Sequence, residues 1–337
     1  MTIKTYSTKI LGSGKCHPSK KLTNNDLSSM MDTSHEWIVE RTGIHQRQIA
    51  DDTKEEWPSV MAYHATLDAL KEARLNPNDI ELILFSITYS EMNFPNTAAL
   101  LQQKLGINNM CPCLDINAAC TGWTYGMEVA DSLIKIGKYK TILLVGADQP
   151  SAFLNWEDRN TAVLFGDGCG VVLLGQTSEN DPNRILNTML MADSAHAENL
   201  ALTNGGIRNP LTPKSFEGRK YPFNLHMDGK LIFKSAIKTM SDLATKILEK
   251  ENLAISDVDH FIPHQANLRI IEGVAKRLEF PLEKVLMNIA DYGNTSSATI
   301  PSVLKKFTEN GTIKKGDLIL MTAFGSGLTA GAILVRY

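Results

Sequence analysis

The 337-residue sequence lacks several features that would assign it to a broad class at once. No stretch approaches the roughly 18 to 20 apolar residues of a membrane-spanning helix. The N-terminal segment has no apolar core of a secretory signal peptide. A net charge of -3 gives no bulk attraction to nucleic acid. We therefore expect a cytoplasmic protein that binds neither membrane nor nucleic acid and whose function depends on a specific site.

Cysteine is also scarce, which argues against a disulfide framework and against a metal site. The five cysteines are an odd number in a long chain, which favours reduced thiols. Cys111 and Cys113 are separated by one residue rather than by the two that are usual in zinc sites, and no histidine lies near them in the sequence. We expect no bound metal and no resident cofactor.

One cysteine, Cys120, stands where an apolar segment ends and an amphipathic helix begins. Apolar residues then recur three and four positions apart, at Trp123, Met127, Ala130, Leu133 and Ile134. A thiol at the start of a helix meets unpaired N–H groups and the positive end of the helix dipole, which lower its pKa. This placement predicts a nucleophile, although the segment alone is equally consistent with Cys120 as a small buried hydrophobic residue.

The chain repeats itself weakly after about 180 residues. Residues 75–85 resemble residues 253–263, and residues 165–174 resemble residues 324–334. Strand-like segments alternate with helical ones, which indicates α/β layers; the clearest are strands at 141–146 and 318–323 and helices at 61–73, 96–105 and 233–250. The repeat predicts two halves, 1–176 and 184–337. A polar stretch over 199–222 reads as a long loop, either a surface excursion or a wall of a substrate channel.

Two further residues in the second half are candidate partners of Cys120. His264 follows an apolar strand, which would hold its ring rigidly at a cleft, and it is the best candidate base. Asn294 lies in a turn that opens another helix, and by the repeat this helix start corresponds to that of Cys120. Each has a plainer alternative, because most single histidines are structural and a Gly-Asn-Thr-Ser turn is good capping chemistry without catalysis.

A cysteine with a histidine and an asparagine does not make a protease here, since no cysteine-protease signature surrounds Cys120. Two hydrogen-bond donors beside a thiol suit another task. They stabilise the enolate oxygen that forms when a β-keto or malonyl carboxylate leaves. The glycine turn at 325–327 would bring a backbone N–H near the cysteine and complete an oxyanion hole.

Six segments spread over nearly the whole chain form one pattern: residues 32–44, 115–122, 165–168, 264–269, 293–296 and 323–329. Together they resemble the β-ketoacyl-acyl carrier protein synthase III family of the thiolase superfamily. The resemblance implies an α/β thiolase-like five-layer αβαβα fold made of two pseudo-repeated halves, and a homodimer. It also implies a catalytic triad of Cys120, His264 and Asn294, with the backbone N–H groups of Cys120 and Ser326 as the oxyanion hole.

The resemblance implies a two-stage reaction in which acyl-coenzyme A is a substrate and not a cofactor. An acyl group first passes from coenzyme A to Cys120. Malonyl-acyl carrier protein then loses carbon dioxide while His264 and Asn294 hold the enolate oxygen, and the carbanion attacks the thioester to give a 3-oxoacyl-acyl carrier protein.

Ligand roles follow from the same resemblance. It implies that coenzyme A is bound by Trp37, Arg41, Arg159, Gly229, Phe233, Ala266 and Asn267. Trp37 and Arg159 would sandwich the adenine, and Arg41 would lie near the phosphates. A patch for the acyl carrier protein would comprise Lys234, Gln265, Arg269, Lys276 and Arg277. Ordinary core packing is the alternative for Trp37 and Phe233, and a solvated helix face is the alternative for the basic residues.

Three departures from the family pattern concern the nucleotide site and the acyl pocket. His45 replaces a common arginine, Ser326 replaces a glycine, and residues 328–330 lack the usual aromatic pair. Ser326 still offers its backbone N–H. Phe94 resembles the residue that crosses the dimer interface to close the partner's acyl pocket, and its bulk favours a short primer.

The sequence therefore predicts an initiating ketosynthase of fatty-acid synthesis that uses a short acyl-coenzyme A. The alternative on the same fold is a specialised ketosynthase or acyltransferase of a secondary-metabolite pathway. A degradative thiolase is disfavoured because no second cysteine stands in the final glycine turn, and a non-catalytic subunit is disfavoured because Cys120 is present. A thiol redox sensor would need a resolving cysteine within reach of Cys120.

Overall fold

The computed structural model describes residues 6–51, 53–218 and 220–337. The strands are β1 (Ser7–Cys16), β2 (Lys20–Thr23), β3 (Gln46–Ile49), β4 (Leu82–Ser86), β5 (Cys113–Ile116), β6 (Thr141–Asp148), β7 (Gly168–Thr177), β8 (Ile185–Ala192), β9 (Leu200–Leu202), β10 (Leu225–Met227), β11 (His260–Pro263), β12 (Leu318–Gly325) and β13 (Thr329–Arg336). The helices are α1 (Asn24–Ser28), α2 (His35–Thr42), α3 (Pro58–Ala73), α4 (Thr97–Leu105), α5 (Gly122–Lys135), α6 (Gly229–Lys250), α7 (Leu268–Arg277), α8 (Ile289–Tyr292) and α9 (Thr299–Glu309).

Two mixed sheets form the framework. The first has the strand order β1-β7-β6-β4-β5, and the second has the order β11-β12-β13-β8. In the first sheet β4 pairs in parallel with β5 and β6, while β7 pairs antiparallel with β1 and β6. The second sheet repeats this scheme, since β11 and β12 are parallel and β13 is antiparallel to both β12 and β8.

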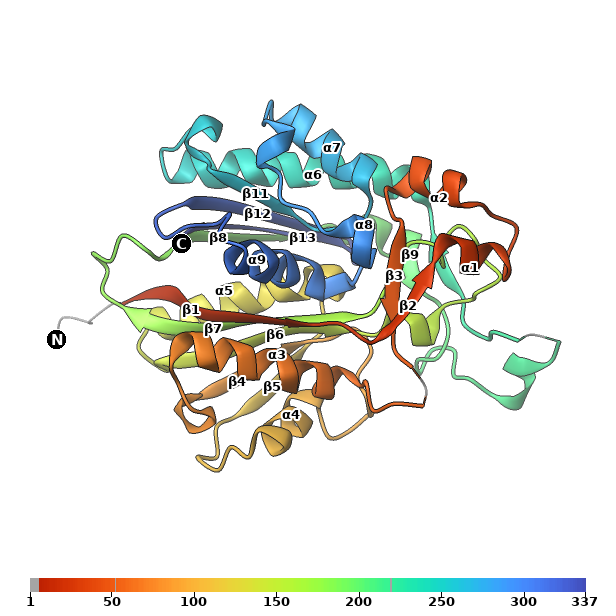
Figure 1. The fold of residues 1–337 in the computed structure, drawn as a ribbon, viewed down its shortest axis with the longest axis horizontal. Helices are drawn as coiled ribbons and strands as arrows, with labels where there is room; N and C mark the ends of the chain where they lie inside the picture. Colours follow the sequence, from red (N-terminus) through yellow and green to blue (C-terminus); the bar gives the residue numbers. More distant parts are fainter. Residues whose placement is uncertain (1–5, 52, 219) are drawn as a thin grey trace.

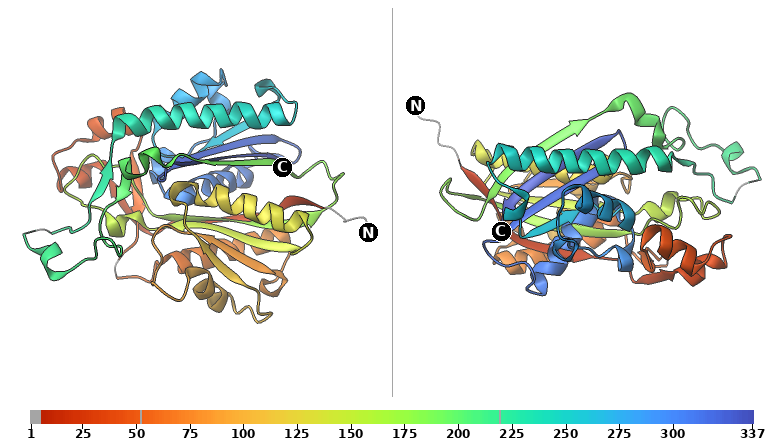
Figure 2. Two further views of the ribbon diagram at one scale, coloured as in Figure 1. Left: turned by 180° about the vertical axis from the view of Figure 1, so that it is seen from behind. Right: turned by 90° about the horizontal axis from the view of Figure 1, so that it is seen from above.

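Helices separate and cover the sheets in five layers (Figures 1 and 2). α3 and α4 pack on the outer face of the first sheet, and α6 packs on the outer face of the second. α5 and α9 lie between the sheets and contact both. Strands covered on both faces must be apolar throughout, and every residue of β12 is buried. This architecture confirms the predicted thiolase-like α/β fold.

The two sheets and their helices correspond in order. β1, β7, β6 and β4 match β8, β13, β12 and β11, and α3, α4 and α5 match α6, α7 and α9. β7 ends at Thr177 and β8 begins at Ile185, close to the expected division of the chain. The exact division into 1–176 and 184–337 stays a prediction.

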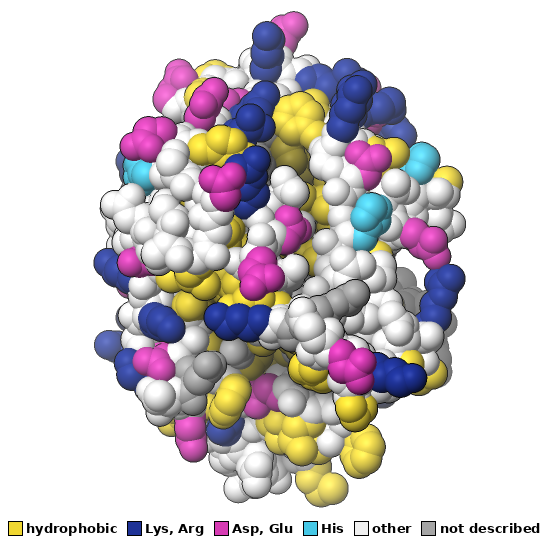
Figure 3. Space-filling view, turned by 90° about the vertical axis from the view of Figure 1, so that its right-hand side faces the viewer, with side chains coloured by type: hydrophobic (Ala, Val, Ile, Leu, Met, Phe, Trp, Pro, Cys, Tyr) yellow, Lys and Arg dark blue, Asp and Glu magenta, His cyan; other side chains and the backbone are white. Residues whose placement is uncertain are grey.

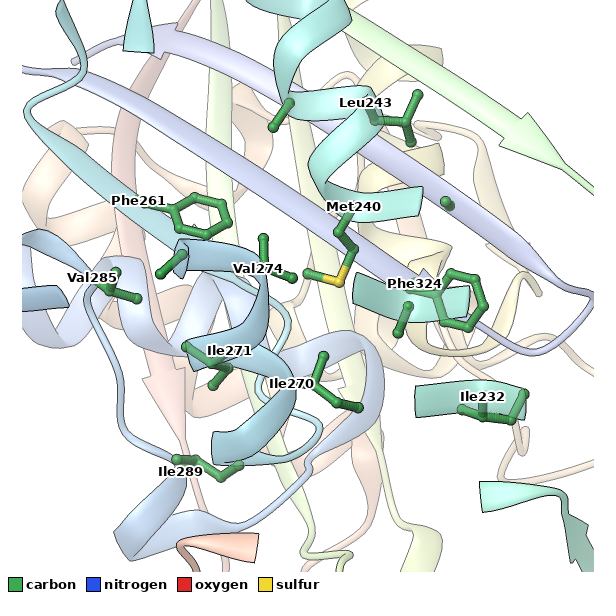
Figure 4. Packing of buried hydrophobic residues seen from close by; sticks show 14 of the residues in the cluster. Ile232, Met240, Leu243, Phe261, Ile270, Ile271, Val274, Val285, Ile289 and Phe324 are labelled. Atoms are coloured by element: carbon green, nitrogen blue, oxygen red, sulfur yellow. The ribbon is translucent and has the colours of Figure 1, made fainter. Parts of the chain in front are cut away.

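Local sequence explains where the main helices begin. α3 starts three residues before the expected 61 because Pro58 occupies the first helical position, where its missing N–H costs no hydrogen bond. α6 starts at Gly229, four residues before the expected 233, because the Asp228 carboxylate accepts the Leu231 N–H at 3.0 Å. Between the second sheet and its covering helices, apolar side chains of α6, α7, β11 and β12 pack together (Figure 4).

The two ends of the expected loop over 199–222 lie next to each other because two short strands pair there. β9 and β10 pair antiparallel, with Leu202 opposite Leu225, so the intervening chain forms an excursion from a short ladder. Ile207 on this excursion is fully exposed at 101%. None of the helices in the described part of the chain is long and apolar enough to cross a membrane.

Candidate active site

Cys120, His264 and Asn294 line one cavity of about 1070 Å³, together with Phe324 and Gly325. The cavity forms where segments that follow the strands of both sheets meet. Binding sites of open α/β sheets usually lie outside the carboxyl ends of their parallel strands, and this cavity follows that rule. The three predicted catalytic residues come from separate segments, and only the tertiary structure brings them to a common space.

Cys120 lies in a tight turn that leads directly into α5. Residues Ala119–Thr121 form a single 3-10 turn, and α5 starts at Gly122, as the helical periodicity predicted. Ala119 adopts a positive φ of 46°, which is strained for a residue with a Cβ. The Ser296 hydroxyl lies 3.7 Å from the Cys120 sulfur. The turn therefore presents the sulfur to the cavity from the start of a helix.

The expected low pKa of Cys120 is wrong for the unliganded site. Burial raises the pKa of the Cys120 thiol to about 11, and the nearby Asp148 carboxylate raises it further. The Ser296 hydroxyl and a backbone N–H act in the opposite direction but do not outweigh burial. Removal of the sulfur from water thus dominates over the helix start, and the thiol is protonated near neutral pH.

His264 follows β11 and is 2% exposed. Its backbone N–H donates to the Thr322 carbonyl of β12 at 2.8 Å, which fixes the segment to the sheet. Its ring Nδ1 lies 2.7 Å from the Thr299 hydroxyl at the first residue of α9. Burial lowers the pKa of His264 to about 4, so the ring is neutral at pH 7. With Nδ1 occupied by Thr299, Nε2 is the ring nitrogen available to the cavity.

Asn294 has its oxygen already engaged, which leaves its amide nitrogen as the free group. The Asn294 Oδ1 accepts the Ser296 N–H at 2.9 Å. Its backbone N–H donates to Leu164 at 2.9 Å, and its carbonyl accepts the Gly166 N–H at 3.1 Å. Three anchors therefore hold Asn294 in one orientation, and within residues 6–51, 53–218 and 220–337 its Nδ2 has no hydrogen-bond partner.

The glycine turn after β12 comes very close to the nucleophile. A Cβ added to Gly325 would lie 3.1 Å from the Cys120 Cβ and 3.2 Å from the Cys120 nitrogen, tighter than almost all real contacts. In the described part of the chain, the Ser326 backbone N–H donates to no other residue. The Ser326 hydroxyl instead donates to the Leu200 carbonyl at 2.5 Å. This arrangement suits a backbone N–H of Ser326 that is kept free for a ligand.

A pair of threonines holds this glycine turn against the nucleophile turn. The Thr121 and Thr329 hydroxyls lie 2.7 Å apart. The Thr121 hydroxyl is also 2.7 Å from the Ala118 carbonyl, and the Thr329 hydroxyl is 2.8 Å from the Ser326 carbonyl. The two hydroxyls supply two protons for three contacts, so only two of the three contacts are hydrogen bonds at any one time, and the hydroxyls link the turns when one of them donates to the other.

The two halves of the chain match parts of one protein family. Residues 114–194 match 3-oxoacyl-[acyl-carrier-protein] synthase III, and residues 248–337 match its C-terminal part. The β-ketoacyl-[acyl-carrier-protein] synthase III of Aquifex aeolicus is 43% identical over 98% of this chain and 99% of its own length. The chain belongs to the β-ketoacyl-[acyl-carrier-protein] synthase III family. It is therefore an acyltransferase with a thiolase-like fold, as predicted.

Other relatives agree with this assignment. The synthase III of Thiobacillus denitrificans is 41% identical over 99% of this chain and all of its own length. The crystal structure of the Aquifex aeolicus synthase III covers 98% of this chain and 100% of its own, with a TM-score of 0.89. A priming β-ketosynthase from the R1128 polyketide pathway is 28% identical, with a TM-score of 0.89 and coverage of 99% and 97%.

On the lining of the cavity, two guanidinium groups face the ring of Trp37 on α2. The Arg41 guanidinium carbon lies 4.7 Å from the ring centroid, and that of Arg159 lies 5.1 Å from it. Arg159 also donates to the Asp32 carbonyl at 2.8 Å. All three proposed nucleotide-binding residues thus lie together, but a base between Trp37 and Arg159 requires Arg159 to move away from the ring.

The other residues expected at coenzyme A also line this cavity: Gly229, Phe233, Ala266 and Asn267. A Cβ at Gly229 would meet no protein atom within 4 Å, so this wall has open space beside it. Asn267 caps α7 by accepting the Arg269 N–H at 2.9 Å, and its Nδ2 donates to the Arg41 carbonyl at 3.0 Å. Asn267 thereby joins the start of α7 to the end of α2.

Four of the five residues expected to bind the carrier protein are exposed on the surface, but Gln265 is not. Gln265 is 0% exposed, because its Nε2 donates to the Pro263 carbonyl at 2.6 Å and its Oε1 accepts the Asn288 N–H at 3.1 Å. It is a structural link and not a surface contact. The basic residues are exposed on α6 and α7: Lys234, Arg269, Lys276 and Arg277. On the face in Figure 3, Lys and Arg side chains flank a hollow with hydrophobic walls.

Phe94 does not line the cavity of its own chain and is 83% exposed. It lies between β4 and α4 and near the edge strand β5. A large apolar side chain so exposed on a single chain is compatible with the interface role that the family resemblance implies.

Several site residues were missed from the sequence. Thr299, Ser296 and Asp148 contact or influence the catalytic groups, and Tyr89 and Phe153 line the cavity. Thr299 and Ser296 fall inside the turn recognised around Asn294, so their position near the site was visible, but their partners were not. No sequence signal distinguished Tyr89, Phe153 or Asp148 from other residues at strand ends.

Proposed function

We propose that this protein condenses a short acyl group from coenzyme A with malonyl-acyl carrier protein, which starts fatty-acid synthesis. In the first stage the Cys120 sulfur bonds to the carbonyl carbon of the acyl-coenzyme A. The carbon–sulfur bond to coenzyme A breaks, and coenzyme A leaves as its thiol with the proton that Cys120 loses. The backbone N–H groups of Cys120 and Ser326 stabilise the negative oxygen of the tetrahedral intermediate.

In the second stage, malonyl-acyl carrier protein loses its carboxylate as carbon dioxide. The electrons of the broken carbon–carbon bond move to the thioester oxygen, where His264 Nε2–H and Asn294 Nδ2–H hold the enolate. The enolate carbon then bonds to the acyl carbon on Cys120, the bond to the sulfur breaks, and the thiolate takes up a proton. Two neutral donors suit this step because they stabilise the anion without forming an ion pair with the incoming carboxylate.

One observation carries the assignment of these roles: both side chains have their other polar atom already occupied. Thr299 holds Nδ1 of His264, and the Ser296 N–H holds Oδ1 of Asn294. The groups left free are the two that can donate to an oxyanion. A neutral His264, with its pKa lowered to about 4 by burial, supports donation from Nε2 rather than a charge–charge contact.

The substrates would enter from the end of the cavity that Trp37, Arg41 and Arg159 surround. An aromatic ring and guanidinium groups bind a base and phosphates, which are the parts of coenzyme A farthest from its sulfur. The acidic carrier protein would dock on Lys234, Arg269, Lys276 and Arg277. Asp242 competes for Arg277 at 3.0 Å, so Lys234, Arg269 and Lys276 are expected to contribute more.

A homodimer is proposed through the edge of the first sheet. In the described chain β5 pairs with no strand other than β4, so it is an edge strand that another chain could pair with, although its Cys113 carbonyl accepts the Asn96 amide N–H at 2.9 Å. Large apolar side chains cluster in and around this edge: Met92, Phe94, Met110 and Leu114 are 51%, 83%, 90% and 50% exposed. Leu114→Lys should convert a dimer into a monomer in size-exclusion chromatography with light scattering, and an unchanged mass would refute this interface. A cytoplasmic location stays a prediction.

The function is tested by intact-mass analysis after incubation with acetyl-, butyryl- and branched acyl-coenzyme A. We expect one acyl adduct on the wild type, none on Cys120→Ala, and an unchanged adduct on the control Cys16→Ala. Addition of malonyl-acyl carrier protein should then release carbon dioxide. His264→Ala and Asn294→Ala should keep acylation better than decarboxylation, and equal loss of both would contradict the division of roles.

The similarity to a polyketide-priming ketosynthase supports a second candidate function, the priming of a secondary-metabolite pathway. The chemistry would be the same, but the primer would differ. A clear preference for a longer or branched primer over acetyl-coenzyme A in the same panel would favour this second function. Acyl-enzyme formation without release of carbon dioxide would favour transfer to another acceptor.

A further inference from the structure

The first stage of the proposed reaction has to move a proton away from Cys120. Burial raises the pKa of the Cys120 thiol to about 11, so the sulfur carries a proton when the acyl-coenzyme A arrives. The thiolate and not the thiol is the nucleophile. The departing coenzyme A is an alkyl thiol of the same chemical kind as cysteine, and near neutral pH it takes up a proton. A group that accepts the first proton and supplies the second would assist both bond changes.

His264 is not placed to serve as this group. The Thr299 hydroxyl occupies Nδ1 of its ring at 2.7 Å. In the second stage proposed above, Nε2 carries the proton that the ring donates to the enolate oxygen, so the neutral ring has no free acceptor atom. Burial also lowers the pKa of His264 to about 4, which disfavours the uptake of a second proton. The proton of Cys120 needs another acceptor.

Ser296 is the residue whose side chain contacts the nucleophilic sulfur. Its hydroxyl oxygen lies 3.7 Å from the Cys120 sulfur, and both residues line the catalytic cavity. Within residues 6–51, 53–218 and 220–337, no other side chain forms a hydrogen bond with this sulfur. Ser296 is 5% exposed and has a positive φ of 54°. Strained backbone of this kind concentrates at active sites, where the surrounding structure fixes it.

The Asp148 carboxylate, whose charge also acts on Cys120, is a poor end point for the proton. It accepts the Thr88 N–H at 2.7 Å and the Ser297 hydroxyl at 2.8 Å, with longer contacts of 3.3 Å to the Thr88 hydroxyl and the Ser297 N–H. Burial raises its pKa, and hydrogen bonds from Thr88, Ser296 and Ser297 act against this rise. Protonation would take an acceptor away from donors that are buried with it, which carries the cost of an unsatisfied group.

The tetrahedral intermediate of the first stage brings the departing sulfur beside the same hydroxyl. In that intermediate the sulfur of Cys120 and the sulfur of coenzyme A are bonded to one carbon atom. A hydroxyl in contact with the first sulfur is therefore within reach of the second. A serine hydroxyl donates one hydrogen bond and accepts others, so it can accept the proton of one sulfur while it gives its own proton to the other.

We propose that Ser296 is a catalytic residue of the first stage and that its hydroxyl relays the Cys120 proton to the sulfur of the departing coenzyme A. The proposal rests on the function proposed above. The S–H bond of Cys120 breaks, its proton passes to the Ser296 oxygen, and its electron pair forms the bond from sulfur to the acyl carbon. The bond between the acyl carbon and the coenzyme A sulfur breaks, and this sulfur takes the original hydroxyl proton of Ser296. The serine ends the step unchanged, and no other base is consumed.

The test compares two acetyl donors that acylate the same sulfur but differ in their leaving group. Acetyl-coenzyme A releases an alkyl thiol that takes up a proton, whereas the acetyl thioester of para-nitrothiophenol releases a stable aryl thiolate. Single-turnover acylation by each donor is followed by intact mass, and Cys120→Ala is used to subtract reaction at other sites. In Ser296→Ala the ratio of the aryl rate to the acetyl-coenzyme A rate should rise about a hundredfold, the usual size of assistance by a positioned proton donor. A change in the basicity or position of Cys120 slows both donors and cancels in this ratio.

Two further variants keep the test clear. Ser296→Gly also removes the hydroxyl, and glycine adopts a positive φ without strain, so it takes the place of an alanine variant that does not fold. Ser90→Ala is the matched control, because Ser90 lines the same cavity and its hydroxyl makes no hydrogen bond with Cys120 among the described residues. Its ratio should equal that of the wild type.

The second stage should survive the loss of the hydroxyl. The backbone N–H of Ser296 that holds Asn294 Oδ1 is still present in both Ser296 variants. Enzyme preloaded with the aryl donor should therefore release carbon dioxide from malonyl-acyl carrier protein at the wild-type rate. A loss at this stage as large as the loss of acylation by acetyl-coenzyme A would overturn the relay, since the side chain would then only shape the turn around Asn294.

An unchanged ratio of the two donors in folded Ser296→Ala and Ser296→Gly would also overturn the relay, and it would leave the proposed function intact. Absence of an acyl adduct on wild-type Cys120 with every acyl-coenzyme A tested would instead refute the proposed function.

Discussion

The hydrogen bond between Thr299 and His264 offers a sharp test of the proposed second stage. The Thr299 hydroxyl lies 2.7 Å from Nδ1 of His264, and both residues are 2% exposed. A neutral imidazole donates from Nε2 only when Nδ1 carries no proton, so the proposed role of Nε2 requires the Thr299 hydroxyl to donate to Nδ1. Thr299→Val keeps the shape of the side chain and removes the hydroxyl.

The size of the effect follows from the burial of this pair. A buried acceptor left without its partner costs about 1 to 3 kcal/mol. If that cost falls on the enolate-stabilising form of His264, decarboxylation slows by about 5-fold to 150-fold. Acylation of Cys120 by acetyl-coenzyme A should change much less, because the proposed first stage relies on the backbone N–H groups of Cys120 and Ser326.

Two rates must be measured on the same preparations. Cys120 acylation is followed by intact mass, and carbon dioxide release from malonyl-acyl carrier protein is followed with a labelled carboxylate. Thr299→Ser retains the hydroxyl and should restore most of the decarboxylation rate, which separates hydrogen bonding from packing. Equal slowing of both stages in Thr299→Val, or no rescue by Thr299→Ser, would refute the assigned role of His264 Nε2.

Three further outcomes are expected. Because the pKa of Cys120 is raised to about 11, its alkylation by iodoacetamide should speed up about tenfold per pH unit from pH 7 to pH 10, and a plateau near pH 8 would contradict this. Burial lowers the pKa of His17 to about 3, so the unfolded state binds a proton below about pH 6.5 that the folded state refuses. The free energy of unfolding of the wild type should therefore fall, relative to that of His17→Gln, by about 1.4 kcal/mol for each pH unit between pH 6 and pH 4. A difference between the two proteins that stays constant with pH in urea unfolding would exclude this account. Thr329→Val removes the hydroxyl that contacts Thr121 and the Ser326 carbonyl, at a net cost of about 1 kcal/mol, and should slow Cys120 acylation about fivefold. An unaltered single-turnover rate would show that this hydroxyl does not position the oxyanion hole.

Much of the fold was readable from local patterns. Apolar periodicity after Cys120 located α5 within its first turn, and the alternation of strands and helices indicated the layers. The weak repeat predicted two similar halves, and the structure has two sheets whose strand orders correspond. Helix starts were the least accurate, since α6 begins at Gly229 through the capping carboxylate of Asp228, which no periodicity reveals.

The sequence also showed which kinds of side chain stand at the site, but it did not show their pKa values or their burial. A thiol at a helix start predicted a lowered pKa for Cys120, whereas its enclosure by the folded chain raises that pKa. Gln265 belongs to a polar motif that suggested a surface contact, yet the Asn288 backbone N–H and the Pro263 carbonyl hold it at 0% exposure. Burial depends on segments remote in the chain, and so these two errors share one physical cause.

The sequence by itself determined which residues are available and on which kind of element each stands: Cys120 before a helix, His264 after a strand, Asn294 in a turn. Only the tertiary structure decided the contacts of Cys120 and His264, because Ser296, Thr299 and Gly325 come from segments remote from them, whereas the hydrogen bond between the Ser296 N–H and Asn294 Oδ1 is local. The same holds for the contacts between the rings of Tyr89, Phe153 and Phe223, which line the cavity. The spacing of apolar residues predicts which face of one helix or strand is buried, but the lining of a cavity depends on contacts between different segments.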